Sequence, residues 1–168
     1  WIVCTFLGLT SQGAYAAPTL QLGYVNASPG DIIEVPVTLA NDGAAALQFD
    51  IHYDSTQLTS NEASAGSAGG SHTLASSIIS PGTRRIVIAP PADNGLIGSG
   101  QLIVLSFTVQ ANATHASRLI VVDNVILSSS SGGRVSLGSV NMGLIADPAN
   151  TTDDQDGDGV PDSWEITY

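Results

Sequence analysis

The sequence contains no lysine and only four arginines, against fifteen aspartates and glutamates, so its formal net charge is −11 at pH 7. Proteins that bind nucleic acid or an anionic membrane surface need clusters of basic side chains. So few basic residues exclude both as general partners. The single cysteine, Cys4, excludes an intrachain disulfide.

Aromatic residues and helical periodicity are also scarce. Aromatic residues make up 5% of the chain, and no segment shows the apolar period of an amphipathic helix. Between residues 17 and 146 the aromatic residues are Tyr24, Phe49, Tyr53 and Phe107. The chain is nevertheless long enough to bury one ordinary hydrophobic core.

Alternating apolar residues dominate the segment 30–58. They fall into two sets, each with a period of two: Ile33, Val35, Val37 and Leu39, then Leu47, Phe49, Ile51 and Tyr53. This period is typical of half-buried β-strands. The residues Asn41, Asp42 and Gly43 between the two sets favour a turn. Because Pro36 cannot donate a ladder hydrogen bond, we expect it at a sheet edge or a bulge.

Similar short apolar segments lie before and after this stretch. They span residues 19–25, 72–79, 83–89, 101–109, 118–127 and 134–145. In the third of these, Ile86 and Ile88 are expected to face inward, and Arg85 and Val87 outward. Eight or nine short strands separated by turn residues predict an all-β protein, an antiparallel β-sandwich.

The first two strands also resemble the start of a cohesin module. The resemblance rests on Pro29-Gly30-Asp31, on Val35-Pro36-Val37-Thr38-Leu39, and on Phe49, Tyr53-Asp54 and Leu58. It extends over residues 19–145. It implies a nine-stranded jelly roll, no catalytic activity, and a dockerin module as the protein partner in bacterial polysaccharide-degrading assemblies.

The ends of the chain differ from this middle part. Residues 1–16 carry no charge and end in Ala14-Tyr15-Ala16, which is typical of a secretory signal peptide cut before Ala17. The run is too short and polar for a membrane span. We therefore expect a secreted or cell-surface protein with a sandwich over residues 17–146, a linker over 147–152, and a calcium-binding segment over 153–168.

The C-terminal segment holds most of the excess negative charge. Seven of the fifteen acidic residues follow Ile145. The other eight lie in the part of the chain that contains all four arginines, which therefore has a net charge of only about −4. Residues 154–165 match the twelve-residue calcium loop without a gap. The expected Ca²⁺ ligands are Asp154, Asp156, Asp158, the Val160 carbonyl, Asp162 and Glu165. The sequence of this loop resembles the calcium-binding repeats of thrombospondin type 3.

No catalytic constellation is evident. His52, His72 and His115 are scattered, and no serine lies in a G-x-S-x-G turn. A carboxylate pair for glycoside hydrolysis could be drawn from Glu34, Asp50 or Asp54, but their spacing does not favour it. The sequence therefore predicts a binding protein and not an enzyme.

Three functions remain open at this stage: a docking module, a carbohydrate-binding module of related fold, and a structural spacer of a large surface protein. A sugar platform usually needs exposed aromatic rings, and three of the four aromatics in the middle part are expected to face inward. The docking function is therefore favoured, although direct polysaccharide binding stays an alternative. The expected partner-binding residues face outward on two strands: Gln48, Asp50, His52, Arg85 and Val87. The resemblance places the first of these strands in the dockerin-binding sheet.

Overall fold

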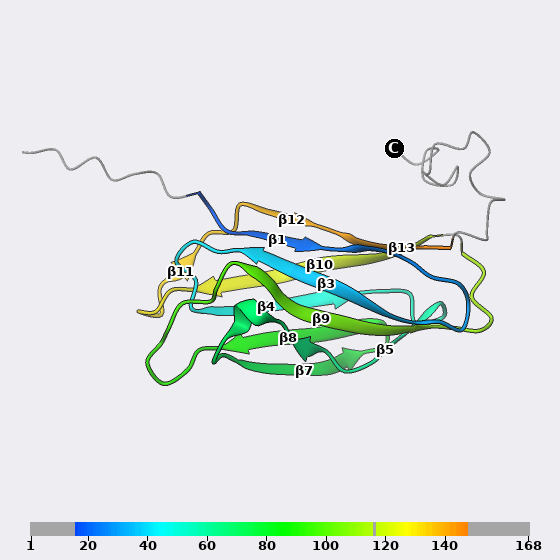
Figure 1. Cartoon of the computed structure of the whole chain (residues 1–168), viewed down its shortest axis with the longest axis horizontal. Helices are drawn as coiled ribbons and strands as arrows, with labels where there is room; N and C mark the ends of the chain where they lie inside the picture. Colours follow the sequence, from blue (N-terminus) through cyan, green and yellow to red (C-terminus); the bar gives the residue numbers. More distant parts are fainter. Residues whose placement is uncertain (1–15, 116, 148–168) are drawn as a thin grey trace, which may run out of the picture.

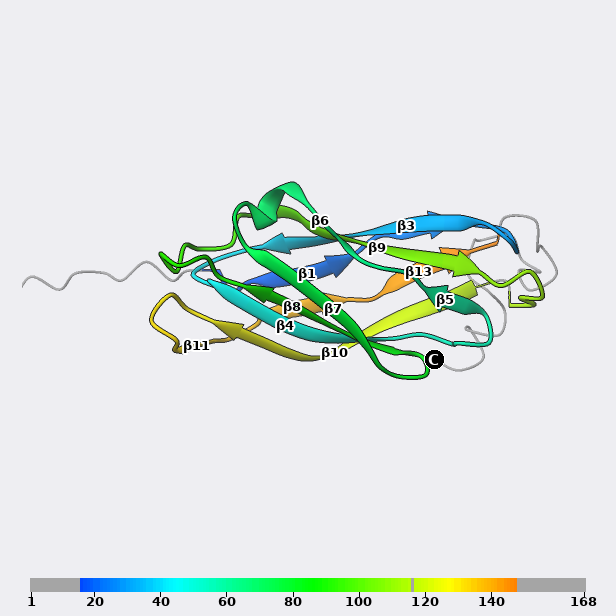
Figure 2. The ribbon, with the colours of Figure 1, turned by 90° about the horizontal axis from the view of Figure 1, so that it is seen from below.

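The computed structural model describes residues 16–115 and 117–147. Two β-sheets face each other across one hydrophobic core (Figures 1 and 2). This is the antiparallel β-sandwich that the sequence predicts. The expected calcium segment over 153–168 lies outside the described residues, as do all but one residue of the expected signal peptide over 1–16 and all but one of the expected linker over 147–152.

The described residues form thirteen strands and one short 3₁₀ helix. The first sheet has the order β12–β1–β3–β9–β5, with β6 also paired to β9, and the second has the order β2–β13–β10–β4–β8–β7, with β11 paired to β10. The elements are β1 (Thr19–Leu22), β2 (Tyr24–Asn26), β3 (Ile32–Ala40), β4 (Ala46–His52), β5 (Leu58–Ser60), β6 (Ser64–Ala65), η1 (Ser67–Gly69), β7 (Thr73–Ser80), β8 (Thr83–Ala89), β9 (Gly100–Val109), β10 (Ser117–Ser128), β11 (Arg134–Val135), β12 (Ser139–Asn141) and β13 (Gly143–Ala146).

The terminal strands divide between the two sheets, which the sequence did not indicate. Residues 19–25, expected as one strand, form β1 in the first sheet and β2 in the second. Gly23 makes this change of sheet possible, because a Cβ there would lie 2.7 Å from Cγ of Pro36. Residues 134–145 likewise divide into β11, β12 and β13. The pairings β1·β12 and β2·β13 are parallel, and the other strand pairs are antiparallel.

The core contains the residues that alternation placed inward. Its buried members include Ile33, Val35, Val37, Leu39, Leu47, Phe49, Ile51, Ile86, Ile88, Ile103, Leu105, Phe107 and Val109. Tyr53 is half-buried and meets Phe107 edge-on, with ring centroids 5.4 Å apart. Burial of this set at about 1.5–3 kcal/mol for each large side chain supplies the main stabilisation of the fold.

Pro36 does not lie on an edge strand, because β3 is flanked by β1 and β9. The pairing with β1 ends at Val37, and the carbonyl of Pro36 accepts a hydrogen bond of 2.8 Å from the N–H of Gly23. The missing N–H of Pro36 therefore faces the side on which β1 has just ended. The register of β3 against β9 shifts between Val37 and Thr38, directly beside it.

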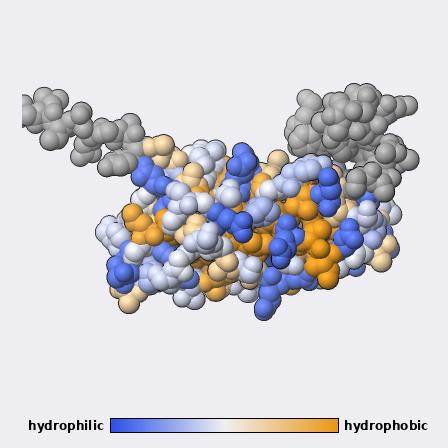
Figure 3. All heavy atoms as spheres, in the orientation of Figure 1, coloured by the Kyte–Doolittle hydropathy of each residue, from blue (hydrophilic) through white to orange (hydrophobic). Residues whose placement is uncertain are grey.

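The outer surface of the first sheet is chemically mixed. Figure 3 shows this side, where apolar residues gather toward the end at which β3 begins. Ile32, the first residue of β3, is 73% exposed. No helix in residues 16–115 and 117–147 is long and apolar enough to cross a membrane.

Candidate functional site

The outer face of the second sheet collects the five residues that the sequence singled out. Gln48, Asp50 and His52 alternate with core residues on β4, and β8 lies directly beside it. The strand register sets Gln48 opposite Val87 and Asp50 opposite Arg85. Alternation therefore predicted correctly which way these side chains face.

Strand β10, on the other side of β4, completes the face. Its register sets Val121 opposite His52, Asp123 opposite Asp50 and Ile126 opposite Gln48. A register shift between Asp123 and Ile126 marks a bulge, and the intervening Asn124 has a φ of 49°. Sequence reasoning missed all four of these β10 residues. The polar pair Asp123-Asn124 within an apolar run was the signal that could have indicated the bulge.

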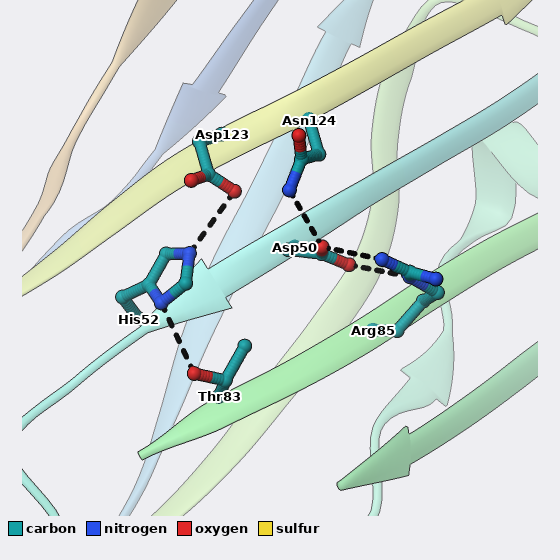
Figure 4. Close-up of polar contacts among 6 residues, drawn as sticks. All are labelled: Asp50, His52, Thr83, Arg85, Asp123 and Asn124. Carbon is teal, nitrogen blue, oxygen red and sulfur yellow. Dashed lines mark hydrogen bonds and ion pairs between the residues drawn. The ribbon is translucent and has the colours of Figure 1, made fainter. Parts of the chain in front are cut away.

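Asp50 lies on the outer face, as alternation predicts, but its neighbours cover its carboxylate; its role in binding a partner stays a prediction. Only 1% of the residue is exposed. Arg85 holds it in a two-pronged contact, with Nε 2.7 Å from Oδ1 and Nη2 2.7 Å from Oδ2. Asn124 Nδ2 donates a third hydrogen bond of 3.0 Å to Oδ2 (Figure 4).

This arrangement fixes the charge of the pair. The hydrogen bonds from Arg85 lower the pKa of Asp50, and the one from Asn124 acts in the same direction. The carboxylate in turn raises the pKa of Arg85. Asp50 and Arg85 therefore present a neutral, ordered pair at the centre of the face, and not two free charges.

His52 bridges the strands on either side of it. Its Nδ1 lies 3.1 Å from Oγ1 of Thr83 on β8, and its Nε2 lies 3.0 Å from Oδ1 of Asp123 on β10 (Figure 4). The side chains of His52 and Asp123 are 41% and 51% exposed. The contact with Asp123 is an ion pair only when the imidazole is protonated.

Apolar side chains flank this polar centre. Ile126 is 47% exposed and Val121 is 38% exposed, both on β10. Val87 on β8 is half-buried. The row Ile126–Gln48–Val87 thus crosses three strands with an apolar residue at each end and an amide between them. Such a mixture of exposed apolar and ordered polar groups suits a protein contact.

The structure separates the carboxylates that could have formed a hydrolytic pair. Glu34 lies on β3 in the first sheet, whereas Asp50 lies on β4 in the second. Asp54 accepts hydrogen bonds from the backbone N–H of Thr56 at 2.8 Å and from its hydroxyl at 2.7 Å. Within the described residues, no group of three His, Cys, Asp or Glu side chains could hold a metal ion.

Similar solved structures share this architecture. The sixth cohesin of scaffoldin B from Acetivibrio cellulolyticus, in complex with a Cel5 dockerin mutant, has a TM-score of 0.70 at 20% identity over 79% of this chain and 99% of that chain. The cohesin CaCohA2 from Clostridium acetobutylicum scores 0.68 at 23% identity, over 80% of this chain and 92% of its own. A non-cellulosomal cohesin from the archaeon Archaeoglobus fulgidus scores 0.66 at 20% identity, over 82% and 96%.

At 20–23% identity, these structures show a shared fold and nothing more. No curated protein matches the chain. The family model is decisive. The model of the cohesin domain matches residues 18–142, which span the sandwich from before β1 to the end of β12. The chain therefore belongs to the cohesin family.

Proposed function

We propose that this cohesin domain binds a dockerin-type protein module through the outer face of strands β10, β4, β8 and β7. Cohesin domains are non-catalytic binding modules. Several similar solved structures are, by their descriptions, cohesin–dockerin complexes. The surface proposed for this contact is the outer face on which the strand register sets Gln48 between Ile126 and Val87.

The observation that carries the proposal is the row Ile126–Gln48–Val87. Ile126 is 47% exposed at the position where the pairing of β10 with β4 resumes after the bulge, and this pairing holds it in place without the partner. A rigid apolar residue beside ordered polar groups can contribute strongly to a protein interface, because little conformational entropy is lost on binding. The Asp50–Arg85–Asn124 cluster next to it keeps the three strands in a fixed arrangement.

Sugar binding has less support from this surface. Of the aromatic side chains in the described part of the chain, Phe49 and Phe107 are buried and Tyr53 is half-buried. Tyr24 on β2 is 60% exposed, but it lies at the far edge of the sheet. A single ring does not make the extended stacking surface that a polysaccharide chain needs.

The substitution Ile126→Lys tests the proposal. It should weaken binding of a dockerin from the same source by about 30-fold or more, as expected when a central apolar contact is replaced by a charge. Calorimetric titration of the full chain with that dockerin measures the change. Because Ile126 is half exposed, the thermal unfolding temperature should change little.

The matched control is Ile32→Lys, the same substitution at an exposed isoleucine of the first sheet. It should leave dockerin affinity unchanged. Equal weakening by both variants, or no weakening by Ile126→Lys, would move the binding surface elsewhere. Retention of insoluble polysaccharide by a domain that ignores every dockerin would favour the carbohydrate-binding alternative.

The proposal extends to the segments outside the described residues. The spacing of Asp154, Asp156, Asp158 and Glu165 supports a calcium loop, and extracellular loops of this kind bind at about 10⁻⁴ to 10⁻³ M. Asp156→Ala should then abolish the calcium-dependent heat in a titration of the full chain, and wild-type protein without such heat would remove this site.

Export is proposed from residues 1–16, and N-terminal sequencing of exported protein tests whether it begins at Ala17.

A further inference from the structure

The edge of the second sheet at β7 differs from the other sheet edges. Strands β2, β12 and β5 end their sheets with three residues each, whereas β7 has eight. Strand β7 pairs with β8 on one side, and no strand in the described part of the chain pairs with its other side. In Figure 2, β7 runs nearest the viewer along this edge. A row of backbone N–H and C=O groups is therefore open to a further strand.

Proline and charged side chains, two of the usual protections of a free edge, are missing along β7. Its sequence, TLASSIIS, contains neither proline nor a charged residue. No aspartate, glutamate, lysine or arginine occurs between Glu62 and Arg84. Ile78 and Ile79 are 55% and 48% exposed. The pairing with β8 is regular from Thr73 to Ile78, and the register shifts only after it, between Ile78 and Ser80. A long, regular and uncharged edge with exposed apolar residues favours the addition of another strand.

We propose that β7 pairs with β7 of a second copy of this chain, antiparallel about a two-fold axis, which joins the two second sheets into one. The choice of a second copy follows from the sequence of β7, in which Leu74 and Ile78 lie symmetrically about Ser76 and can pair across a two-fold axis. The chain carries a net charge of −11, so two copies repel each other wherever acidic surfaces meet. The segment 63–83 contains no Asp, Glu, Lys or Arg, so a contact at β7 brings no acidic side chains of that segment together.

The side chains of β7 are compatible with this symmetry. In an antiparallel pair, opposed residues must share a face, so a two-fold axis at Ser76 sets Leu74 of one copy opposite Ile78 of the other. Both residues lie on the face of β7 that Arg84 and Ile88 mark as inward. The axis at Ser77 would instead oppose Ile78 to Ser76. The first register gives two apolar cross-strand pairs for each dimer.

The contact is small. A single strand pair with four apolar side chains buries less surface than stable dimers of standard size, so the dimer should be weak and concentration-dependent. It uses the edge of the sheet and leaves the face around Gln48 and Ile126 outside the contact. Self-association and dockerin binding are therefore separable by mutation.

Sedimentation equilibrium of the full chain up to about 1 mM tests the inference. The average mass should rise from monomer toward dimer, and Ile78→Lys should weaken self-association at least tenfold, because a charge on the edge blocks strand addition. Ile32→Lys and Ile126→Lys place the same charge on other exposed surfaces and should associate as wild type does. A monomeric wild type at this concentration, or an Ile78→Lys variant that associates normally, would overturn the proposal.

Hydrogen exchange of the wild-type protein gives a test that needs no variant. Amides of residues 73–80 that exchange rapidly in dilute solution should become protected as concentration rises, because pairing hydrogen-bonds the free edge. Concentration-dependent protection at β2, β5 or β12 without any at β7 would place the contact at a different edge and contradict the inference.

Discussion

Replacing Asp50 with alanine is expected to lower the free energy of unfolding by about 3 kcal/mol. The carboxylate is 1% exposed and accepts two hydrogen bonds from Arg85 and one from Asn124. Its removal leaves both donors without their acceptor. The side chain of Arg85 is 38% exposed and keeps contact with water. This places the expected loss at the lower end of the range for breaking a buried ion pair.

Urea-induced unfolding measures this change, and Asp123→Ala is the matched control. Asp123 lies opposite Asp50 on β10, but its side chain is 51% exposed and is paired with His52 at 3.0 Å. Its removal should cost less than about 1 kcal/mol. If Asp50→Ala were no more destabilising than Asp123→Ala, the Asp50 cluster would not stabilise the sheet.

The same cluster predicts how stability depends on pH. The hydrogen bonds from Arg85 lower the pKa of Asp50 in the folded state, whereas an aspartate in the unfolded chain has a pKa of about 3.9. The unfolded state therefore binds the proton more readily. The contribution of Asp50 is fully present above about pH 4 to 5 and is lost as pH falls through its lowered pKa. The stability difference between wild type and Asp50→Asn should shrink over that acidic range.

Asp50 also shows how far alternation in a sequence can be taken. A period of two predicts which face of a strand a residue occupies, and Gln48, Asp50 and His52 do face outward on β4. It does not predict the neighbours of that strand. Asn124 lies 74 residues away from Asp50, and a bulge whose position depends on tertiary pairing brings the two together. Exposure on the outer face therefore could not be predicted residue by residue.

The same alternation could have predicted that Arg84 and Arg118 face inward. Arg84 has the parity of Ile86 and Ile88, and it is buried with hydrogen bonds from Nε to Oγ of Ser60 at 2.8 Å and from Nη1 to Oγ of Ser76 at 2.7 Å. Arg118 likewise has the parity of the buried Ile120. Alternation indicates their direction. Which polar groups receive each cation depends on contacts between sheets and loops, which the local pattern does not contain.

Asp147→Ala is expected to destabilise the protein more than any exposed acidic substitution, by about 3–5 kcal/mol. The side chains of Arg118 and Asp147 are 1% and 7% exposed, and Nη2 of Arg118 lies 3.8 Å from Oδ2 of Asp147. Burial lowers the pKa of Arg118, which shows the cost of desolvating its charge, and Asp147 opposes that shift. Without Asp147 the buried guanidinium would keep the weak hydrogen bond that its Nη1 donates to the Ala27 carbonyl, at 3.5 Å.

A double-mutant cycle separates the cost of the unpaired charge from the loss of other contacts of Asp147. Asp147 also accepts a hydrogen bond of 3.2 Å from the Ser28 hydroxyl, so Ser28→Ala reports that contact alone. Arg118→Met removes the cation and keeps an apolar side chain of similar length. The variant with both Arg118→Met and Asp147→Ala should therefore be more stable than Asp147→Ala alone, because no buried charge remains without a partner. Additive effects of the two substitutions in urea unfolding would show that Asp147 does not stabilise Arg118.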